Sequence, residues 1–456
     1  METTLNPNPE IVVALNIGSN KVLAIVGKKN ILGKMEILGS GKAPCDGVVR
    51  GVVTNIDKTA KAIGDAIDLA EKKSKQLIET VFVGIAGDHI KSMHHQGVLY
   101  RDDPKKEITQ EDIDRLSQDM YKIPLAHGDK ILHVLPQEFL VDHNDPCMDP
   151  IGMSGSRLES NFHIITANSD ALENLMRAVD KAGVTVSGFI LESLATADAV
   201  LSKEEKAGGV VLVDMGGGTT EVSIHLEGII RYTSVIPLGS NVITKDIKVG
   251  CSVLPEQAEK LKVRFGSALA DEIVDNRVIT IPGLMGREPK EISEKNLARI
   301  IQSRVEELFE YVMWEIRRSG FENSLIAGMV LTGGGSKLRD IELLAELQTG
   351  LSTRIGEPLE NKISLFDQEY AHPSYATAIG ILSDALKRVT PHLPVEIPEQ
   401  KTTAEIMDLE EDDLPVFAEV ETGGSKLKGN GWIEKVNSRI KETIHGFFKE
   451  NPDNEF

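Results

Sequence analysis

Two glycine-rich turns are the part of this sequence best suited to chemistry. The first holds Gly18, Ser19, Asn20 and Lys21, and the second holds Gly216, Gly217, Gly218, Thr219 and Thr220. Glycine lets backbone N–H groups close around phosphate oxygens, because it has no side chain and tolerates unusual dihedral angles. Asp214 precedes the second turn and supplies a carboxylate suited to magnesium held through water. Together the turns predict a binding site for the phosphates of a nucleotide.

A third glycine turn contains Gly333, Gly334, Gly335 and Ser336 and follows a short apolar run. Its backbone could lie against a nucleoside, although a glycine that merely ends a strand is the alternative. Either of the first two turns, taken alone, is equally consistent with an ordinary hairpin. No GxxxxGK[ST] run occurs and no GxGxxG follows a strand, which argues against P-loop and Rossmann sites. The three turns therefore predict a nucleotide site of another type.

Short β-branched strands flank the first two turns. Ile11–Leu15 and Val22–Val26 surround the first turn, and a helix over Lys58–Lys75 follows it. Around the second turn the same pattern recurs, with strands over Val210–Asp214 and Glu221–His225. Two similar halves indicate an internal duplication.

Further helices are expected in both halves. They cover Asp170–Ala182, Val242–Arg264, Leu297–Arg318 and Ile341–Leu347. Between the two halves, Asp88–Ile165 is less regular and rich in His, Asp and Pro, which predicts a small inserted domain.

Composition limits the function classes. The 456 residues carry a formal net charge of -20, which disfavours nucleic-acid binding. The three cysteines are far apart and form no CxxC pair, so neither a disulfide framework nor a thiolate zinc site is indicated, and a reducing cytoplasm fits. No signal peptide or transmembrane segment is expected.

The end of the chain combines an acidic linker with an amphipathic helix. Thr390–Gly431 is rich in Pro, Gly and acids and cannot bury enough apolar surface to offset its ordering entropy. Beyond it, apolar side chains recur at three- and four-residue steps and basic ones occupy the other sides. The apolar set is Trp432, Ile433, Val436, Ile440, Ile444, Phe447 and Phe448, and the basic set includes Lys435, Arg439 and Lys441. The pattern predicts a helix lying in the interface of anionic lipid, with docking on the protein's own core as the alternative.

The three turns, with their flanking elements, resemble the actin, Hsp70 and sugar-kinase superfamily. Within it, the chain resembles the FtsA family of bacterial division actins through Pro150–Leu158, His163–Thr166, Val235–Gly239 and Lys262–Gly266. The position of the insert agrees, and the likeness runs from about residue 11 to residue 386. It implies an α/β fold of the actin-like two-domain ATPase type, with an inserted small domain called 1C and a C-terminal amphipathic helix.

The resemblance also implies a domain division. Domain 1A would comprise residues 10–88 with 166–205 and 370–389, domain 1C residues 89–165, domain 2A residues 206–240 with 322–369, and domain 2B residues 241–321. A disordered acidic linker over 390–430 and a membrane-targeting helix over 431–449 would follow.

ATP and Mg²⁺ are the cofactors that the resemblance implies. Asn16–Lys21 matches the first phosphate loop, Asp214–Glu221 the second, and Thr332–Ser336 the adenosine loop. Leu191–Val200 and Ser374–Ile381 match the two connecting helices. In addition, Glu259 and Lys262 match side chains that contact adenosine, and Glu192 joins Asp214 in holding Mg²⁺ through water.

Asn16 departs from the superfamily pattern, which usually has Asp or Glu at this position. A neutral amide holds hydrated magnesium less strongly than a carboxylate does. Because phosphoryl transfer depends mainly on the metal and on positioning, this departure predicts ATP binding with slow or absent hydrolysis.

By resemblance, the protein polymerises on the cytoplasmic face of the inner membrane at the division site. Its partners would be the FtsZ C-terminal peptide on domain 2B, other copies of itself, anionic lipid, and later division proteins through domain 1C. Two different functions stay open beside this one: an FtsA-like scaffold of pilus or secretion assembly, and a small-molecule kinase of the same superfamily. Asn16 and the lipid-seeking tail count against the kinase.

Overall fold

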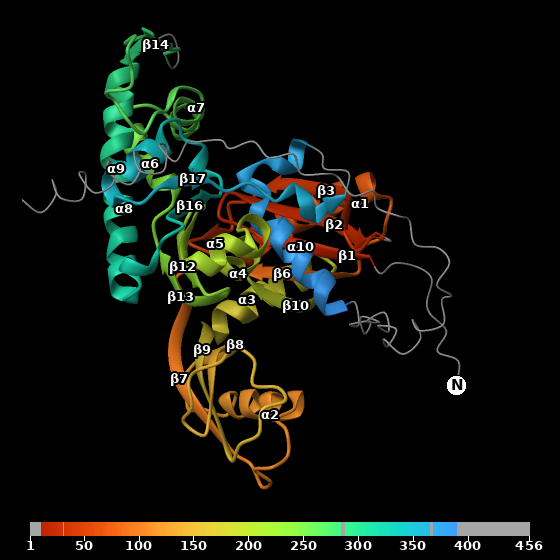
Figure 1. The fold of residues 1–456 in the computed structure, drawn as a ribbon. Helices are drawn as coiled ribbons and strands as arrows, with labels where there is room; N and C mark the ends of the chain where they lie inside the picture. The colour runs from red at the N-terminus through yellow and green to blue at the C-terminus, as the bar shows by residue number, and fades with distance from the viewer. Residues whose placement is uncertain (1–10, 31, 284–287, 365–367, 390–456) are drawn as a thin grey trace, which may run out of the picture. The chain divides into compact units, whose positions relative to one another are not determined.

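The computed structural model describes residues 11–30, 32–283, 288–364 and 368–389. The first half of this region is built on a six-stranded sheet, and Figure 1 shows where its strands lie. The strand order is β10-β6-β1-β2-β3-β18. The strands are β1 (Val12–Ile17), β2 (Lys21–Lys29), β3 (Met35–Pro44), β6 (Thr80–Ile85), β10 (Thr185–Leu191) and β18 (Ile363–Ser364). The hairpin predicted around the first glycine turn is confirmed as β1 and β2, which pair antiparallel, while β1 pairs parallel with β6.

Two helices cover one face of this sheet. Helix α1 (Ile56–Ser74) begins at Asn55, whose side chain accepts a hydrogen bond from the Lys58 backbone N–H and so satisfies one free donor of the first turn. Its buried face packs on β3 at close range, since a Cβ at Gly41 would lie 1.8 Å from the Ala66 carbonyl oxygen. Helix α3 (Ser169–Lys181) packs beside α1, and the short pair β4 (Val48–Val49) and β5 (Val52–Val53) lies between β3 and α1 in sequence.

The second half repeats this plan around a five-stranded sheet of order β13-β12-β11-β16-β17. Its strands are β11 (Val210–Met215), β12 (Thr220–Leu226), β13 (Ile229–Ile236), β16 (Met329–Thr332) and β17 (Thr353–Ile355). Here β11 pairs antiparallel with β12 and parallel with β16, as β1 does with β2 and β6. The matching topology agrees with the duplication predicted from the sequence.

The helices of the second half are α6 (Ser240–Gly250), α7 (Pro255–Phe265), α8 (Glu294–Ser319) and α9 (Ile341–Thr349), with a hairpin of β14 (Val278–Ile281) and β15 (Lys290–Ser293). The single helix predicted over Val242–Arg264 is wrong, because the chain breaks between α6 and α7. Ser252 has a positive φ of 47°, and Pro255 starts α7, where its missing N–H costs nothing.

The inserted segment is more regular than its composition suggested. Strands β7 (Ile90–Tyr100), β8 (Asp129–Val141) and β9 (Arg157–Asn168) form a three-stranded sheet of order β7-β9-β8, and α2 (Gln110–Met120) packs against it (Figure 1). Phe162, Ile164 and Leu158 of the central strand are fully buried in the core between sheet and helix. The expectation of an irregular stretch is therefore wrong for most of this segment.

Helices α4 (Glu192–Val200) and α10 (Ala376–Val389) link the halves, and the short α5 (Lys203–Gly208) follows α4. They cross where a Cβ at Gly380 would lie only 1.9 Å from the Ala195 carbonyl oxygen. Of the three thiols, Cys45 and Cys251 are buried and Cys147 is partly buried, and all are free. Within the described residues, no helix combines the length and apolarity that crossing a membrane requires. The predicted linker and amphipathic tail lie outside the described residues.

Candidate nucleotide-binding site

A cavity of about 440 Å³ lies where the glycine turns of the two halves face each other. Its volume falls within the range of roughly 300–1,000 Å³ that is usual for small-molecule sites. The predicted residues that line it are Asn16, Gly18, Ser19, Asn20, Lys21, Glu192, Asp214, Gly216, Gly217, Gly218, Thr219, Glu259, Lys262, Gly333, Gly334 and Gly335. Residues more than 300 positions apart in the sequence thus meet in one cavity.

The first two turns close in the same way. The Gly18 N–H donates to the Lys21 carbonyl oxygen over 3.0 Å, and the Gly216 N–H donates to the Thr219 carbonyl oxygen over 2.9 Å. Asn16 and Asp214 each stand two residues before the closing glycine, so the amide and the carboxylate occupy equivalent places. The equivalence identifies Asn16 as the neutral counterpart of Asp214.

The two turns touch each other across the cavity mouth. A Cβ at Gly217 would lie 2.6 Å from Asn20 Nδ2, and a Cβ at Gly218 would lie 2.4 Å from Ser19 Oγ. Below 3.0 Å something must shift, and here the atoms that would give way are the ends of the Asn20 and Ser19 side chains. Glycine at both positions therefore lets the two turns meet with the Asn20 and Ser19 side chains in place.

Asp214 is held by both connecting helices. Its Oδ2 accepts hydrogen bonds from Thr377 Oγ1 of α10 (2.9 Å) and Thr196 Oγ1 of α4 (3.2 Å), and the two hydroxyl oxygens are 3.1 Å apart. Removal from bulk water raises the pKa of Asp214, and the threonine hydroxyls oppose that shift. One carboxyl of the second turn is thereby tied to both links between the halves.

Two further carboxyls line the cavity beside Asp214. Burial and the nearby Asp214 raise the pKa of Glu192, and burial with the charges of Glu192 and Asp214 raises the pKa of Glu221. Glu221 pairs directly with Asp214 in the β11–β12 register, which places both side chains on one face of the hairpin. The raised pKa values mean that these three carboxyls resist ionisation. A hydrated divalent cation beside them would stabilise their ionised form.

Lys21 supplies positive charge at the first turn. Its Nζ donates to the Ser374 carbonyl oxygen over 2.9 Å and lies 5.7 Å from the centroid of the Tyr375 ring. Burial, together with Lys42 and Lys337, lowers the pKa of Lys21 to about 8, while Asp214 opposes the shift. An anion in the cavity would favour the charged ammonium.

The opposite end of the cavity is formed by α6, α7 and the third turn. Lys262 is buried, and its Nζ lies 2.8 Å from Glu259 Oε2, 2.8 Å from Thr244 Oγ1 and 3.2 Å from the Ser240 carbonyl oxygen. Gly333 has a φ of +83°, which suits glycine, and a Cβ there would lie 2.2 Å from Asp214 Oδ1. This end offers backbone, the polar pair of Glu259 and Lys262, and the further basic residues Arg264, Lys337 and Arg339.

Two predicted residues do not line the cavity. Thr220 is fully buried and donates to the Leu238 carbonyl oxygen, and Ser336 donates to the Gly333 carbonyl oxygen and lines a neighbouring cavity instead. Thr196, Thr377 and Glu221 lie within the predicted connecting helices and second phosphate loop, but sequence reasoning gave none of the three a role at the site. The lipid-facing set from Trp432 to Phe448 lies outside the described residues.

The residues present fit a magnesium nucleotide. Backbone N–H groups of the two turns and the Lys21 ammonium suit phosphate oxygens, the carboxyls of Asp214 and Glu192 suit a hydrated cation, and the third turn leaves backbone room for a nucleoside.

Comparison with solved structures bears on the fold. A PilM–PilN type IV pilus biogenesis complex matches with a TM-score of 0.60 at 15% identity, over 82% of this chain and 98% of that one. Together with the duplicated halves and the cavity between them, the likeness places the fold among actin-like proteins.

Sequence comparison then gives the family. Residues 211–380 match the model of cell division protein FtsA, and residues 87–166 match the SHS2 domain inserted in FtsA. Cell division protein FtsA of Pseudomonas aeruginosa is 38% identical over 379 residues, which cover 83% of this chain and 90% of the relative. That of Escherichia coli K12 is 34% identical over 381 residues, 82% of this chain and 90% of the relative. The chain belongs to the FtsA family of actin-like cell division proteins.

Proposed function

We propose that the protein binds Mg²⁺-ATP in the cavity between its halves and works as a division protein that assembles on the membrane. The observation that carries the proposal is the meeting of two equivalent glycine turns over a floor of three carboxyls. A nucleotide in this site would contact both halves at once, so its binding would favour the closed arrangement of the halves over open ones.

Each group has a role in this proposal. The turn N–H groups and Lys21 contact the phosphates, Asp214 and Glu192 hold the hydrated cation, and Glu259 with Lys262 faces the adenosine. The cation supplies charge neutralisation for phosphoryl transfer. Asn16 leaves one side of the cation without a carboxylate, so we expect slow or absent hydrolysis.

Assembly and attachment complete the proposed function. The four domains follow the boundaries expected from the family, closed bodies polymerise, and the helix over 431–449 lies in anionic lipid of the inner membrane. Domain 2B receives the FtsZ C-terminal peptide, which anchors the ring, and domain 1C receives later division proteins. Many weakly held tails on one polymer bind more tightly than one tail does.

Membership in the FtsA family favours this function over a pilus scaffold or a small-molecule kinase. Nucleotide binding is tested by fluorescence of a mant-labelled ATP with the full chain. Binding that requires Mg²⁺ and is displaced by unlabelled ATP supports the proposal, and absence of binding refutes the nucleotide part.

Membrane attachment is tested by co-sedimentation with vesicles of anionic lipid, with ATP and magnesium present. The full chain is compared with a chain that ends at residue 429 and with the full chain carrying Ile440→Glu and Phe447→Glu. We expect only the unaltered full chain to sediment. Equal sedimentation of all three would refute the tether and favour a pilus scaffold or a small-molecule kinase instead.

A further inference from the structure

The inserted domain contacts the second half through a set of hydrogen bonds to β13. His163 of β9 is fully buried; its Nδ1 lies 3.3 Å from the Arg231 carbonyl oxygen and its Nε2 lies 3.2 Å from Thr233 Oγ1. Because a carbonyl oxygen can only accept, Nδ1 carries the proton and Nε2 accepts from the threonine hydroxyl. Burial and His94 lower the pKa of His163 to about 4, which agrees with this neutral form.

Two side chains reinforce this contact. Ser92 Oγ of β7 donates to the Thr233 carbonyl oxygen over 3.1 Å, and the Arg231 guanidinium pairs with Glu138 of β8 at 2.5 Å. Thr233 therefore bonds to the insert through both its hydroxyl and its backbone. All three strands of the insert take part in the contact.

The insert also contacts the end of β10, directly before the connecting helix α4. His133 Nε2 accepts the backbone N–H of Leu191 over 3.3 Å, and Leu191 is the residue directly before α4 and Glu192. A register shift in β8 between Ile131 and His133 re-aims the chain at this point. Burial and Arg388 lower the pKa of His133 to about 4, so its ring stays neutral and able to accept.

The contact with β13 and the contact with Leu191 lie next to each other, behind the carboxyls of the nucleotide cavity. A small cavity of about 10 Å³, room for a single water, is lined by Ile90 and Lys91 of the insert, by Leu191, by Thr233 and by Glu221. Glu221 also lines the large cavity, so it separates the cleft from the insert. Its register partner on β13 is Val235, two residues beyond Thr233.

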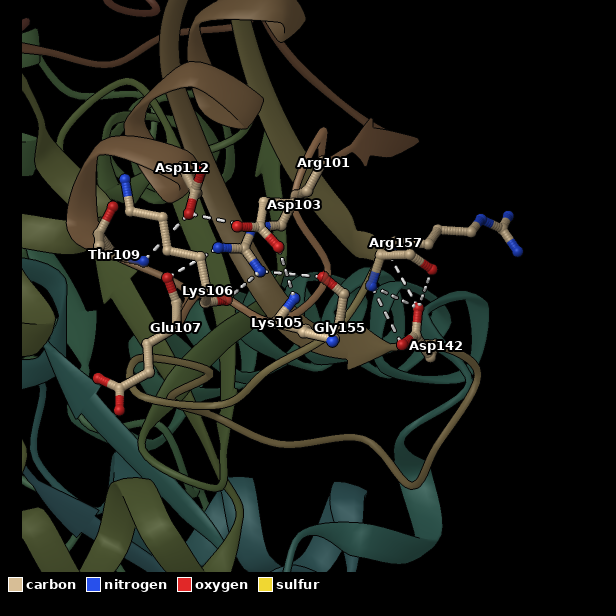
Figure 2. Close-up of polar contacts among 11 residues, drawn as sticks. Arg101, Asp103, Lys105, Lys106, Glu107, Thr109, Asp112, Asp142, Gly155 and Arg157 are labelled. Atoms are coloured by element: carbon tan, nitrogen blue, oxygen red, sulfur yellow. Dashed lines mark hydrogen bonds and ion pairs between the residues drawn. The ribbon is translucent and has the colours of Figure 1, made fainter.

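The rest of the insert is stiffened by a second network, shown in Figure 2. Arg101, whose side chain is 6% exposed, donates to the backbone oxygens of Lys106, Glu107 and Gly155 over 2.7–2.9 Å and pairs with Asp112 of α2 at 3.3 Å. Asp142 accepts from the backbone N–H groups of Ser156 and Arg157. Hydrogen bonds thus fix the insert both within its own fold and at its contacts with β13 and Leu191. A displacement of the insert would therefore be passed on to those contacts.

We propose that the inserted domain acts as a strut that holds β13 of the second half against the start of α4, and thereby slows the release of nucleotide from the cleft. The proposal rests on the proposed nucleotide function and adds its regulation. Displacing the insert would pull on Thr233 and on Leu191 together, one on each side of Glu221. Both displacements would loosen the packing around Glu221, which lines the nucleotide cavity.

The test uses the full chain with His163→Phe, which keeps an aromatic side chain, although a larger one, and removes both hydrogen bonds. A milder, isosteric variant, Thr233→Val, removes the hydroxyl alone, and His127→Phe repeats the first exchange at an exposed position of the insert as a control. We expect mant-ATP to dissociate roughly threefold to tenfold faster from His163→Phe, as fits the loss of about one net hydrogen bond. Thr233→Val should show a smaller increase and His127→Phe none.

Amide hydrogen exchange on the nucleotide-free proteins separates this inference from the nucleotide function. His163→Phe should speed exchange at the start of α4 and in the turn 216–219, beyond the contact itself. Faster exchange confined to β13 and the insert, or an unchanged dissociation rate in a natively folded variant, would overturn the strut. Failure of the unaltered chain to bind mant-ATP would overturn the nucleotide function, while the exchange pattern would still decide whether the insert is coupled to the cleft.

Discussion

Asn20 and Asn241 exchange two hydrogen bonds across the mouth of the cleft, with Nδ2 of each donating to Oδ1 of the other over 2.8 and 2.6 Å. Asn20 belongs to the turn of the first half, and Asn241 stands in the first turn of α6 in the second half. The α6 backbone is fixed in turn, since the Asn241 N–H donates to the Gly217 carbonyl oxygen over 2.9 Å. The pair therefore joins the two halves directly.

Removing one amide of this pair should ease opening of the cleft. We expect Asn241→Ala to release mant-ATP roughly threefold to tenfold faster, from the loss of about one net hydrogen bond. Because the amides act on each other, Asn20→Ala with Asn241→Ala should release it no faster than Asn20→Ala alone. Stopped-flow dissociation measures all three, and additive effects would show that the amides act separately.

Asp214 should matter for the response to nucleotide more than for folding. Its pKa is raised, so the isosteric Asp214→Asn resembles the protonated carboxyl, and we expect a thermal midpoint close to that of the unaltered nucleotide-free protein. The rise in midpoint caused by Mg²⁺-ATP should fall by at least about half, because a neutral amide binds the cation weakly. Asp68→Asn, an exposed exchange on α1, is the control; a full nucleotide response in Asp214→Asn would contradict the assigned role.

Asn16→Asp should restore the carboxylate that the first turn lacks. If the missing charge limits hydrolysis, the rate of phosphate release should rise on the order of tenfold, equivalent to about 1.4 kcal/mol of barrier. Phosphate release at saturating Mg²⁺-ATP measures it, with Asn20→Asp as a control for added charge. No increase in the Asn16→Asp variant would mean that another step limits the reaction.

Gly380→Ala should destabilise the protein strongly. A Cβ there would lie 1.9 Å from the Ala195 carbonyl oxygen, and the two helices can separate only by losing their packing. We expect a loss of roughly 1–3 kcal/mol, the usual cost of overpacking. Gly64→Ala on α1, where the added methyl meets no atom within 4 Å, should instead stabilise by about 0.5–1 kcal/mol. Denaturant midpoints compare the two, and equal effects would refute the close crossing.

His225 should make stability depend on acid. The side chain is 3% exposed, its Nε2 lies 3.3 Å from Ser223 Oγ, and burial followed by the charge of Lys206 lowers its pKa to about 3. The unfolded chain binds a proton near pH 6.5 and the folded one does not. The contribution of neutral His225 to the free energy of unfolding is therefore fully present above pH 6.5. Below pH 6.5 this contribution falls by about 1.4 kcal/mol per pH unit, until the pH approaches 3.

The measurement is the denaturant midpoint between pH 7 and pH 5. His225→Phe should lose midpoint less steeply than the unaltered protein, whereas Ser223→Ala, which keeps the histidine, should retain the steep dependence. Parallel slopes for the unaltered protein and His225→Phe would exclude this linkage.

Local patterns predicted the turns and their flanking strands, because glycine spacing and β-branched runs act over a few residues. They could not predict that Thr196, Thr377 and Glu221 gather around Asp214, since that depends on where two distant helices cross. Pro255 is a residue type that often starts a helix, but the apolar residues of α6 and α7 keep a helical spacing on both sides of it, which led to the prediction of a single helix. In the insert, polar and proline residues hid strands whose buried residues, such as Phe162 and Ile164, alternate only in part.

Gly218 also fixes how narrow the gap between the halves can become. With only a hydrogen on its α-carbon, it comes within reach of Ser19, where a Cβ would lie 2.4 Å from the serine oxygen. The Ser19 hydroxyl can turn away from an added Cβ, but Ser19 Cβ at 3.0 Å and the Arg50 backbone nitrogen at 3.1 Å have less freedom to move, so a larger side chain at 218 would press on the first half. Variants with side chains of increasing size at this position, from alanine to valine, would therefore show how the separation of the two halves depends on the space filled between them.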